Sequence, residues 1–521
     1  MTRAALLFLV SGALGALAFP PVGLDLLIWG ALTPFFVAAA GRPRFRVAML
    51  FGLTWFGIGI SWMIPLSLWE YGPLVVVLSL YTAGVASAVG ALWDRSPRAL
   101  FPFAAALAWT GGDVFRGWFL SGFPWLYAGH AVAARAALLQ TADLWGATGL
   151  DFLVALANAG LAHAWLRRRA GWLREAGPAL AVVVALLVAA LVYGGMRLRE
   201  RTPAEGPALT AVQPNIAQSL KDDQTHGQTN LRLLARLTQR VVVEGPAGDL
   251  ILWPETAHPA RYVIDDPEGP PYDELRRVVA ERWRRPMLFG VVARDAAGLR
   301  NSAVLLDAAG VRRGWYHKVR LVPFAEYLPG RGRFPPSDWA AGLINRCFGF
   351  DPELVPGDQV APLRWREDAP PFAALICYDT AYAATTREAA ARGAAFLVNL
   401  SNEGWYGAAE LDQMVDLCRF RAVEVRRGMF RCVNTGISCY VDPWGDVTGR
   451  LEVGGRDRDV AGTFTARVHV RTGTTLFARI GDPLGWIAMG WFLAWTVARG
   501  AARRTFRRPA NAGPPPNACA Y

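Results

Sequence analysis

The chain has 521 residues, of which 53% are hydrophobic and only 18% are charged, and its mean hydropathy is +0.23. A soluble protein of this length normally carries more charge, so the composition excludes a simple soluble enzyme. The net charge of +12 does not indicate a nucleic-acid partner, because no basic patch is interleaved with aromatic residues.

Apolar residues dominate residues 1–196 and return near 476–498. They form about eight segments close to the ~20 residues that a membrane-spanning helix needs. Arg3 and the first apolar run resemble a signal peptide, but further apolar segments follow at once, so the first helix is expected to stay in the protein. The expected helices are 4–19, 22–40, 46–68, 73–93, 99–120, 145–166, 178–196 and 476–498.

Arginines in the connecting loops predict the orientation of the chain. The arginine-rich segments (42–46, 95–98, 167–174 and 499–508) all fall on one side if both termini are cytoplasmic. Positively charged loops stay in the cytoplasm. The predicted divisions are therefore a transmembrane domain of seven helices (1–199), an extracytoplasmic domain (200–472), a last membrane helix (473–498) and a basic cytoplasmic tail (499–521) that is expected to be disordered.

Residues 200–472 alternate short apolar runs with helical ones, which is typical of a layered α/β domain. Functional side chains in such folds follow the ends of strands. The strands are expected at 208–213, 249–253, 287–293, 302–307, 372–377, 395–400 and 438–442, and the helices at 229–243, 272–284, 383–392 and 411–426.

Three polar clusters stand at the ends of apolar runs. Glu255 lies in LILWPETAHP, Lys318 in WYHKVRLVPFAEYLP and Cys377 in ALICYDTAY. A thiol is a good acyl acceptor only as the thiolate, so it needs a base and an electropositive neighbour. The carboxylate would take the thiol proton, and the ammonium would stabilise the oxyanion of a tetrahedral intermediate.

The residue types alone leave a plainer interpretation open. A cysteine at a strand end is more often a small core residue, Glu255 could cap the following helix, and Lys318 could be a solvated surface charge. The six cysteines include no CxxC pair, so a zinc or redox motif is not expected, although one disulfide is possible outside the cytoplasm. No metal-ligand spacing appears, and neither a metal nor another cofactor is expected.

Seven segments of the soluble stretch occur in a recognisable order. They are VQPNIAQSLK (212–221), WPETA (253–257), RNSAVLL (300–306), YHKVRLVPFAEYLP (316–329), ICYDTAY (376–382), NLSNEGWYG (399–407) and RFRAVEVRRGMFRCVNTGIS (419–438). Together they resemble the nitrilase superfamily. With the apolar helices and SGFPWLYAGHA (121–131) between two of them, they resemble the apolipoprotein N-acyltransferases of the bacterial envelope, and the resemblance covers most of the chain.

The resemblance implies a four-layer αββα sandwich for the soluble domain and a role for each matched residue. Glu255 corresponds to the general base, Lys318 to the oxyanion-stabilising lysine and Cys377 to the nucleophile. Glu326 matches a second glutamate that supports the lysine and the base. The other matched residues line the active site or the loops above it: Asn301, Tyr378, Asp379, Asn402, Trp405 and Tyr406. For the last two, anchoring at the membrane interface is an equally good interpretation.

Three positions depart from the family's usual pattern. Asp379 stands where the family usually has glutamate, Asp222 follows Lys221 where a tryptophan is usual, and Asp113 replaces a glutamate four residues after Trp109. Asp113 also lies inside an expected membrane helix, where a charge needs a partner or a cavity. None of the departures falls on the three catalytic positions, so they bear on substrate contacts and lid packing rather than on the chemistry.

The resemblance implies the last step of lipoprotein maturation at a bacterial inner membrane. A phospholipid donates its acyl chain through a cysteine thioester to the N-terminal amine of a diacylglyceryl-cysteine apolipoprotein, and a monomer is expected. One alternative is a membrane-tethered nitrilase-type amidase. The GFPW block (122–125) and the Trp405 loop favour the transferase over this alternative. The other alternative is a non-catalytic membrane transporter or scaffold. The intact set of three catalytic residues argues against it.

Overall fold

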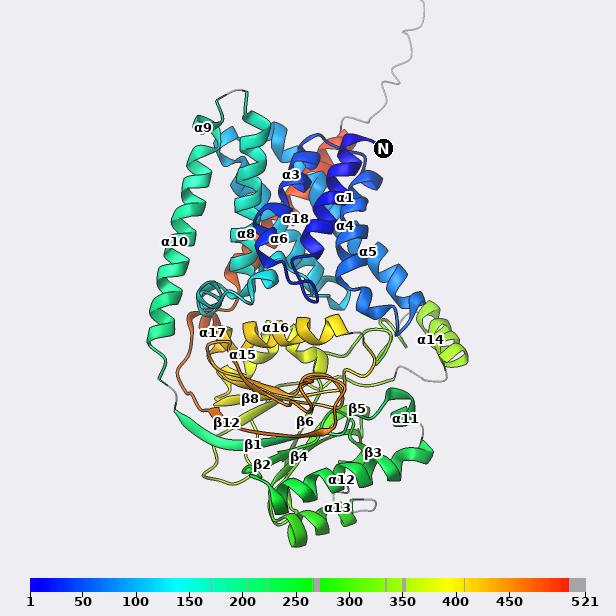
Figure 1. The fold of residues 1–521 in the computed structure, drawn as a ribbon. Coiled ribbons are helices and arrows are strands. Elements are labelled where there is room, and N and C mark those ends of the chain that lie inside the picture. The colour runs from blue at the N-terminus through cyan, green and yellow to red at the C-terminus, as the bar shows by residue number, and fades with distance from the viewer. Residues whose placement is uncertain are drawn as a thin grey trace, which may run out of the picture.

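The computed structural model describes residues 1–505, except 170, 203, 223, 265, 267–271, 333–334, 349–352 and 407. The disorder predicted for the tail concerns residues that lie mostly outside this range. Figure 1 shows a bundle of helices above a stack of two sheets, with the helices α15 (Ala383–Ala391) and α16 (Ala408–Val425) between them.

A helix occupies each of the eight predicted apolar segments. The bundle consists of α1 (Arg3–Ala16), α2 (Ile28–Ala31), α3 (Thr33–Ala40), α4 (Phe45–Gly59), α5 (Leu68–Arg95), α6 (Phe101–Trp118), α7 (Ala136–Leu139), α8 (Ala142–Arg167), α9 (Trp172–Glu175), α10 (Gly177–Arg199) and α18 (Pro483–Thr505). Within the described residues, α5, α8 and α10 are long and apolar enough to cross a membrane, while α1, α4, α18 and the segment 25–40 are apolar but shorter.

Several helix ends differ from the predicted ones, and proline or glycine lies at most of the breaks. The expected helix 22–40 is divided, with Pro34 in the first turn of α3, where its fixed φ and missing N–H are tolerated. The expected helix 46–68 ends at Gly59. The expected helix 476–498 is divided into α17 (Leu476–Ile480) and α18 by Gly481, whose φ of 76° ends the helical path.

Two sheets form the second part. The strand order is β12-β1-β2-β4-β5-β6 in the first, with β3 beside β4, and β11-β10-β9-β8-β7 in the second. All seven predicted strands are present, and β3, β6, β9, β11 and β12 were not predicted. The bounds are β1 Glu205–Gln213, β2 Leu250–Leu252, β3 His258–Val263, β4 Met287–Asp295, β5 Gly298–Leu306, β6 Arg312–His317, β7 Phe372–Ile376, β8 Phe396–Ser401, β9 Met429–Val433, β10 Cys439–Val441, β11 Val447–Arg450 and β12 Gly462–His469.

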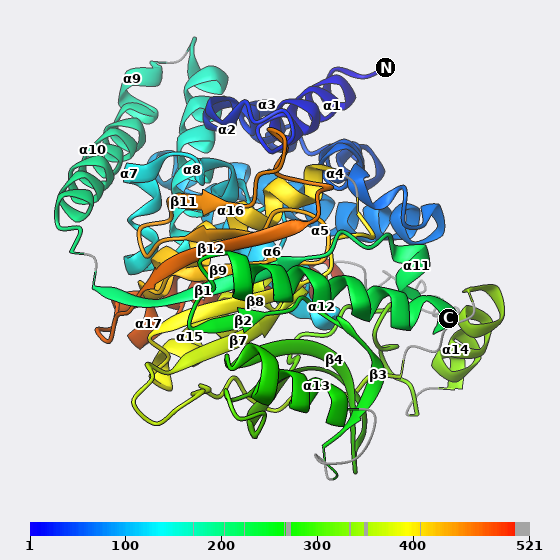
Figure 2. The same cartoon turned by 60° about the horizontal axis from the view of Figure 1, so that its bottom comes forward.

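Alternating side chains of β2 show how the layers are built. Leu250 and Leu252 pack into the core between the two sheets, while Ile251 and Trp253 pack under the helices on the outer face of the first sheet. These outer helices are α12 (Gly227–Glu244) and α13 (Asp273–Arg277), which continues as η7 (Val278–Trp283). With α15 and α16 on the second sheet, the part is the predicted αββα sandwich, as Figures 1 and 2 show. Two further helices, α11 (Gln218–Asp222) and α14 (Pro335–Phe348), lie at its edge.

Helix α16 belongs to both parts of the molecule. Residues three or four positions apart on one side pack against the bundle, and those on the other side pack against the second sheet. The first set is Met414, Leu417, Phe420 and Val423, and the second is Leu411, Cys418, Ala422 and Val425. The helix therefore joins the sandwich to the bundle through one continuous buried interior.

Gln413 on α16 makes four hydrogen bonds across this junction. Its Oε1 accepts from the indole Nε1 of Trp62 at 3.1 Å and of Trp125 at 2.7 Å. Its Nε2 donates to the carbonyl oxygens of Pro20 at 2.9 Å and Gly59 at 3.0 Å. The buried amide is thus fully satisfied by three separate segments of the bundle.

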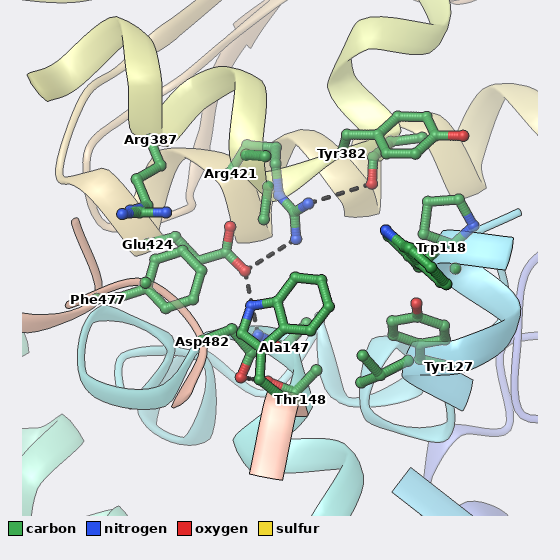
Figure 3. Close-up of a pocket in the computed structure, with 18 of the residues that line it drawn as sticks. Trp118, Tyr127, Ala147, Thr148, Tyr382, Arg387, Arg421, Glu424, Phe477 and Asp482 are labelled. Carbon is green, nitrogen blue, oxygen red and sulfur yellow. Dashed lines mark hydrogen bonds and ion pairs between the residues drawn. The ribbon is translucent and has the colours of Figure 1, made fainter. Parts of the chain in front are cut away.

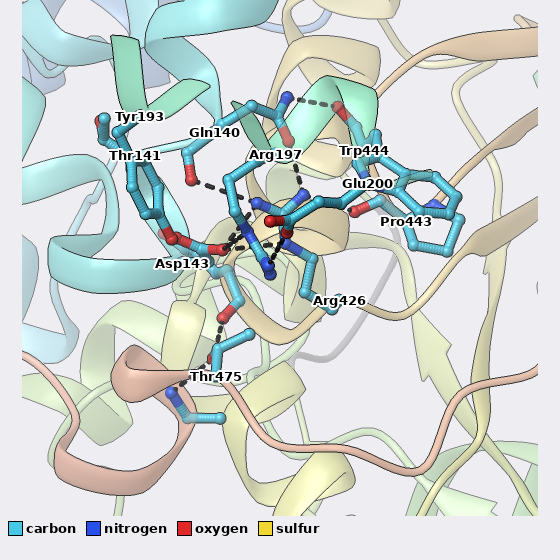
Figure 4. Close-up of polar contacts among 12 residues, drawn as sticks. Gln140, Thr141, Asp143, Tyr193, Arg197, Glu200, Arg426, Pro443, Trp444 and Thr475 are labelled. Carbon is cyan, nitrogen blue, oxygen red and sulfur yellow. Dashed lines mark hydrogen bonds and ion pairs between the residues drawn. The ribbon is translucent and has the colours of Figure 1, made fainter. Parts of the chain in front are cut away.

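A buried ionic cluster fixes the other end of α16 (Figure 4). Arg426, the residue after the helix, contacts Asp143 Oδ2 with its Nη2 at 2.6 Å and Gln140 Oε1 with its Nη1 at 2.5 Å. From α10, Tyr193 Oη donates to Asp143 Oδ1 at 2.7 Å, and Arg197 Nε lies 3.2 Å from Oδ2. A buried charge left without its partner is costly, so this cluster fixes α8, α10 and α16 relative to one another.

Candidate active site

Cys377 lies at the turn that follows β7. Its backbone φ is 47°, in the left-handed region that residues with a side chain rarely adopt. Such strain persists only where the surrounding structure imposes it, and it is common at catalytic positions. The turn places the buried thiol beyond the end of the strand, as the sequence predicted.

The carboxylate of Asp379 stabilises this turn by accepting three hydrogen bonds. Its Oδ2 accepts from the backbone N–H of Ile376 at 2.9 Å and from the Tyr316 hydroxyl at 2.7 Å. Its Oδ1 accepts from the backbone N–H of Arg320 at 2.8 Å. Its hydrogen bonds therefore fix the turn at Cys377, while the expectation that this departure bears on substrate contacts stays a prediction.

Lys318 lies between the two predicted glutamates. It follows β6, and its Nζ is 3.3 Å from Glu255 Oε1 and 3.0 and 2.9 Å from the two carboxylate oxygens of Glu326. The Nδ2 of Asn301 on β5 donates to Glu255 at 2.7 Å and to Glu326 at 2.8 Å. Four of the predicted site residues thus form one hydrogen-bonded group around a buried ammonium.

Two further contacts orient the carboxylates. The backbone N–H of Asn402 donates to Glu255 Oε2 at 2.9 Å, and that of Val322 donates to Glu326 Oε2 at 2.7 Å. Glu255 Oε1 is occupied by Asn301 and Lys318. Each glutamate is therefore held at both oxygens, and held groups give catalysis its geometry.

The pKa values of Cys377 and Lys318 are both raised, for different reasons. Burial raises the pKa of the Cys377 thiol, the charge of Glu255 raises it further, and Lys318 lowers it less, so the resting thiol keeps its proton. Burial would lower the pKa of Lys318, but the charges of Glu255 and Glu326 outweigh it and hold the pKa well above its usual value. The thiol is therefore protonated and the ammonium charged in this arrangement.

Tyr378 connects the nucleophile turn to the bundle. Its hydroxyl lies 3.4 Å from the carbonyl oxygen of Gly122, to which Tyr382 Oη also donates at 3.0 Å. Arg116 of α6 supports the same loop by donating to the carbonyl oxygens of Phe123 and Trp125, both at 2.7 Å. The predicted block between two apolar helices thus lies against the residue that follows the nucleophile.

Asp113 and Arg116 satisfy the expectation that charges inside the apolar segment have partners. Arg116 Nη2 lies 2.8 Å from Asp113 Oδ1, and both side chains are buried. The shorter acid at this position therefore anchors the arginine that supports the loop. The Asp222 side chain lies outside the described residues, so that departure stays a prediction.

The three residues predicted for substrate binding or a lid follow β8. Asn402 Nδ2 donates to Gln218 Oε1 at 2.7 Å, which ties the loop to α11. The Tyr406 ring packs edge-on against Trp62 of the bundle, with centroids 5.1 Å apart. Trp405 is 41% exposed. Gly407 lies outside the described residues, and the mobility of the loop stays a prediction.

Sequence reasoning missed two residues close to the nucleophile. Tyr316, which donates to Asp379, lies in the same block as Lys318 and could have been found from that block. Glu410 is buried, and burial together with the charge of Glu403 holds its pKa well above the usual value; when it is ionised, its charge raises the pKa of Cys377. Its surroundings, AAELDQ, read as the exposed face of a helix, so no sequence signal points to it.

The other cysteines are placed as core residues. Cys418, Cys432 and Cys439 are free, buried thiols in α16, β9 and β10, and Cys377 is also free. The side chain of Cys347 and the whole of Cys519 lie outside the described residues. In the part of the chain that the structure describes, no group of three His, Cys, Asp or Glu residues is arranged to hold a metal ion.

Two family models match the chain. The one described as the apolipoprotein N-acyltransferase N-terminal domain matches residues 11–160, and the one described as carbon-nitrogen hydrolase matches residues 209–470. The first falls on the bundle, and the second falls on the sandwich that carries the group around Lys318.

Curated relatives match over nearly the whole length. The apolipoprotein N-acyltransferase of Geobacter metallireducens is 30% identical over 505 residues, which cover 92% of each chain. That of Azotobacter vinelandii is 33% identical over 485 residues, or 86% of each chain. That of Gloeobacter violaceus is 30% identical over 510 residues, which cover 93% of this chain and 90% of that one. The similarity therefore spans the bundle and the sandwich together.

Proposed function

This chain belongs to the apolipoprotein N-acyltransferase family, and we propose that its reaction passes through an acyl thioester on Cys377. The protein N-acylates lipoproteins: it transfers an acyl chain from a phospholipid to the N-terminal amine of a diacylglyceryl-cysteine lipoprotein. The amidase and scaffold alternatives are not favoured. The curated relatives are named apolipoprotein N-acyltransferases, and they match both parts of the chain.

In the first half-reaction, Cys377 Sγ attacks the carbonyl carbon of a phospholipid ester. Glu255 takes the thiol proton, which the raised pKa of the buried thiol would otherwise keep in place. The Lys318 ammonium stabilises the oxyanion of the tetrahedral intermediate. The C–O bond then breaks, Glu255 returns the proton to the leaving oxygen, and a lysophospholipid departs from the thioester.

In the second half-reaction, the N-terminal amine of the lipoprotein attacks the thioester carbonyl. Glu255 accepts a proton from the amine, Lys318 again stabilises the oxyanion, and the C–S bond breaks. The sulfur leaves with the proton that Glu255 held, so the enzyme returns to its first state. One base and one ammonium therefore serve both halves, which suits a ping-pong reaction.

The observation that carries this proposal is the hydrogen-bonded group of Lys318, Glu255, Glu326 and Asn301 beside the strained turn of Cys377. Glu326 supports it by binding Lys318 through both of its carboxylate oxygens. We infer that Glu326, Asn301 and Asp379 are positioning residues, and that Tyr378 and the loop 402–406 contact the lipid substrates.

The site lies at the junction of the sandwich with the bundle, where lipid substrates can reach it. We infer that the divisions at 199, 472 and 498 hold, that the chain crosses the membrane several times, and that the sandwich lies outside the cytoplasm. The arginine-rich loops between the helices support this orientation.

Intact-mass analysis of the purified chain tests the proposed thioester. After incubation with phospholipid, we expect a labile adduct with the mass of one acyl chain, which Cys377→Ser abolishes because the hydroxyl has a much higher pKa than a thiol. Cys432→Ser is the matched control, since its thiol donates to the Leu252 carbonyl at 3.3 Å and a hydroxyl can do the same. A normal adduct in Cys377→Ser, or loading from small amides alone, would contradict the proposal.

A further inference from the structure

A cavity of ≈ 230 Å³ lies between the bundle and the sandwich, apart from the proposed catalytic residues. Its walls come from α6, α8 and the loop after α6 on one side, and from η8 (Cys377–Ala381), α15 and α16 on the other (Figure 3). The turn between α17 and α18 closes one end. Cys377, Glu255 and Lys318 are not among its lining residues.

Two arginines of the cavity have no acidic partner. Arg387 on α15 is half-buried and donates from Nε to the Ala478 carbonyl at 3.3 Å. Arg320 stacks over the Tyr382 ring, with its Cζ 4.8 Å from the centroid. Among the described residues, no carboxylate lies within 4.0 Å of either guanidinium. Their positive charges are therefore available to an anion.

Gly481 makes room for one of these cations. Its φ is 76°, and an added Cβ would lie 3.0 Å from Cζ of Arg387. A residue with a side chain at this position would press on the guanidinium and would also be strained. The glycine thus lets the turn before α18 approach Arg387 closely.

A buried ion pair at the cavity wall has unused hydrogen-bonding atoms. Arg421 and Glu424 lie on α16 and face the cavity in Figure 3, with Nη2 and Oε1 2.8 Å apart. Both side chains are almost fully buried, yet Arg421 Nε and Glu424 Oε2 have no hydrogen-bond partner among the residues that the structure describes. Buried polar atoms of this kind normally have a partner, so Arg421 Nε calls for an acceptor at this wall, while Glu424 Oε2 calls for a donor.

The entrance of the cavity is aromatic and faces the surroundings of the bundle. Trp118 at the end of α6 is 57% exposed, and Trp486 at the start of α18 is 52% exposed. Leu120, in the loop after Trp118, is 71% exposed. Tryptophans at helix ends are enriched where lipid headgroups meet the hydrocarbon. The combination of cations inside and tryptophans at the entrance fits an amphiphile with a charged head.

We propose that this cavity is a second lipid site, which binds the phosphodiester headgroup of a membrane glycerophospholipid. The phosphate oxygens accept from Arg387 and Arg421 Nε, and the acyl chains leave past Trp118 and Trp486. This site goes beyond the acyl transfer, since its lipid is held and not cleaved. It is nonetheless near the nucleophile turn, because Tyr382 in its wall lies 3.4 Å from the Tyr378 hydroxyl.

Photolabelling of the full chain in detergent tests the proposal. The probe is a phosphatidylcholine with a diazirine in one acyl chain, compared with a diacylglycerol that carries the same chain and no phosphate. We expect labelled peptides from 114–130 and 477–486, at least tenfold more with the phospholipid. Arg387→Gln should reduce this labelling about tenfold, and Arg387→Lys should retain it because the charge remains. Arg392→Gln, just past α15 and paired with Glu388, should change nothing.

Equal labelling by the diacylglycerol, or unchanged labelling in Arg387→Gln, would overturn the headgroup site. Displacement by inorganic phosphate at the concentration of the lipid would show that the cavity takes a free anion, and would overturn the lipid assignment. If Arg387→Gln lowers the melting temperature, Arg320→Gln replaces it, because it removes the other cavity guanidinium that has no acidic partner among the described residues, and it should also lower the labelling. The acyl adduct on Cys377 is scored separately in the same samples, so its absence would count against the thioester alone.

Discussion

The short side chain of Asp379 fixes the position of the backbone turn at Cys377. Its two oxygens accept three hydrogen bonds, from the strand before Cys377, from the loop after Lys318 and from Tyr316. The turn and the lysine loop are thereby fixed to each other through a single carboxylate. A carboxylate can accept all three bonds, whereas a protonated acid or an amide must spend part of its capacity on donating.

Asp379 makes the acyl-loading step sensitive to acid. Burial raises its pKa to about 6, so the carboxyl is ionised above this pH and protonated below it. We expect the rate of adduct formation to fall as the pH drops through about 6. Asp379→Asn should be slower at every pH by at least tenfold, about 1.4 kcal/mol, and should lose this inflection. Single-turnover loading across the pH range measures both, and an inflection that persists in Asp379→Asn would assign it to another group.

Helix α16 is covered on two sides, by the bundle and by the second sheet. Its apolar residues face both the bundle and the second sheet, so neither a single apolar stripe nor an exposed face exists. Glu410 and Gln413 look like surface residues in the sequence for this reason, although both are buried. The helix was predicted within a few residues, but what surrounds it could not be.

Gln413→Leu should weaken the junction between the two parts. The substitution keeps the volume but leaves two indole N–H groups and two carbonyls without partners, and each unsatisfied buried group costs about 1–3 kcal/mol. We expect a loss of several kcal/mol, seen as a lower melting temperature in detergent. Gln239→Leu is the control, because Gln239 accepts only one bond, from Trp283 Nε1 at 3.2 Å. Equal shifts in the two variants would mean that the junction does not depend on Gln413.

The loop after β8 packs one aromatic ring against the bundle and exposes another. Tyr406 packs against Trp62, whereas Trp405 is 41% exposed. Tyr406 can therefore hold the loop against the bundle while Trp405 moves. If the loop is a lid, Trp405→Ala should lower turnover at least tenfold, about 1.4 kcal/mol. Trp165→Ala, with a similarly exposed ring on α8, should not. Turnover of Trp405→Ala within twofold of the parent would leave the anchor interpretation standing.

The unpredicted strands have physical reasons for escaping a pattern search. β9 contains Arg431, which looks polar in the sequence but is buried in an ion pair with Glu403. β12 is the edge strand of the first sheet, and most of its residues are only half-buried, so no apolar run marks it. By contrast, β7 and β8 are buried throughout and were found. Cys377 and Asn402 were predictable because they follow such strands, whereas Lys318 follows the unpredicted β6 and was found from its sequence block. The contacts of Asp379 required the folded chain.

At the scale of the whole molecule, one buried cluster unites the bundle with the nucleophile turn. Tyr378 and Tyr382 pack in the same interior as the helices α1 to α8. The proposed thiol is therefore next to the membrane part and not on a remote face of the sandwich. Such a position suits two substrates that are both lipids.

The orientation of the chain is testable with fusions. A reporter that is active only outside the cytoplasm should be on after Thr202 and off after Arg508, because we expect the arginine-rich loops to hold both termini in the cytoplasm. A fusion after Arg44 is the internal control and should also be off. The reverse pattern would contradict both the orientation and the access of the site to exported lipoproteins.

The pairing of β1 with β12 sets an order for biosynthesis. β1 is translated as the first strand of the sandwich and β12 as the last, yet the two are neighbours from Glu205 opposite His469 to Gln213 opposite Gly462. Until β12 emerges from the ribosome, one side of β1 has unpaired backbone groups, and open edges of this kind invite aggregation. Only the final strand, β12, covers the free edge of β1, and only then does the chain reach α18. A truncation anywhere before residue 462 should therefore yield a nascent sandwich that needs a chaperone, while the bundle helices made earlier are already in place.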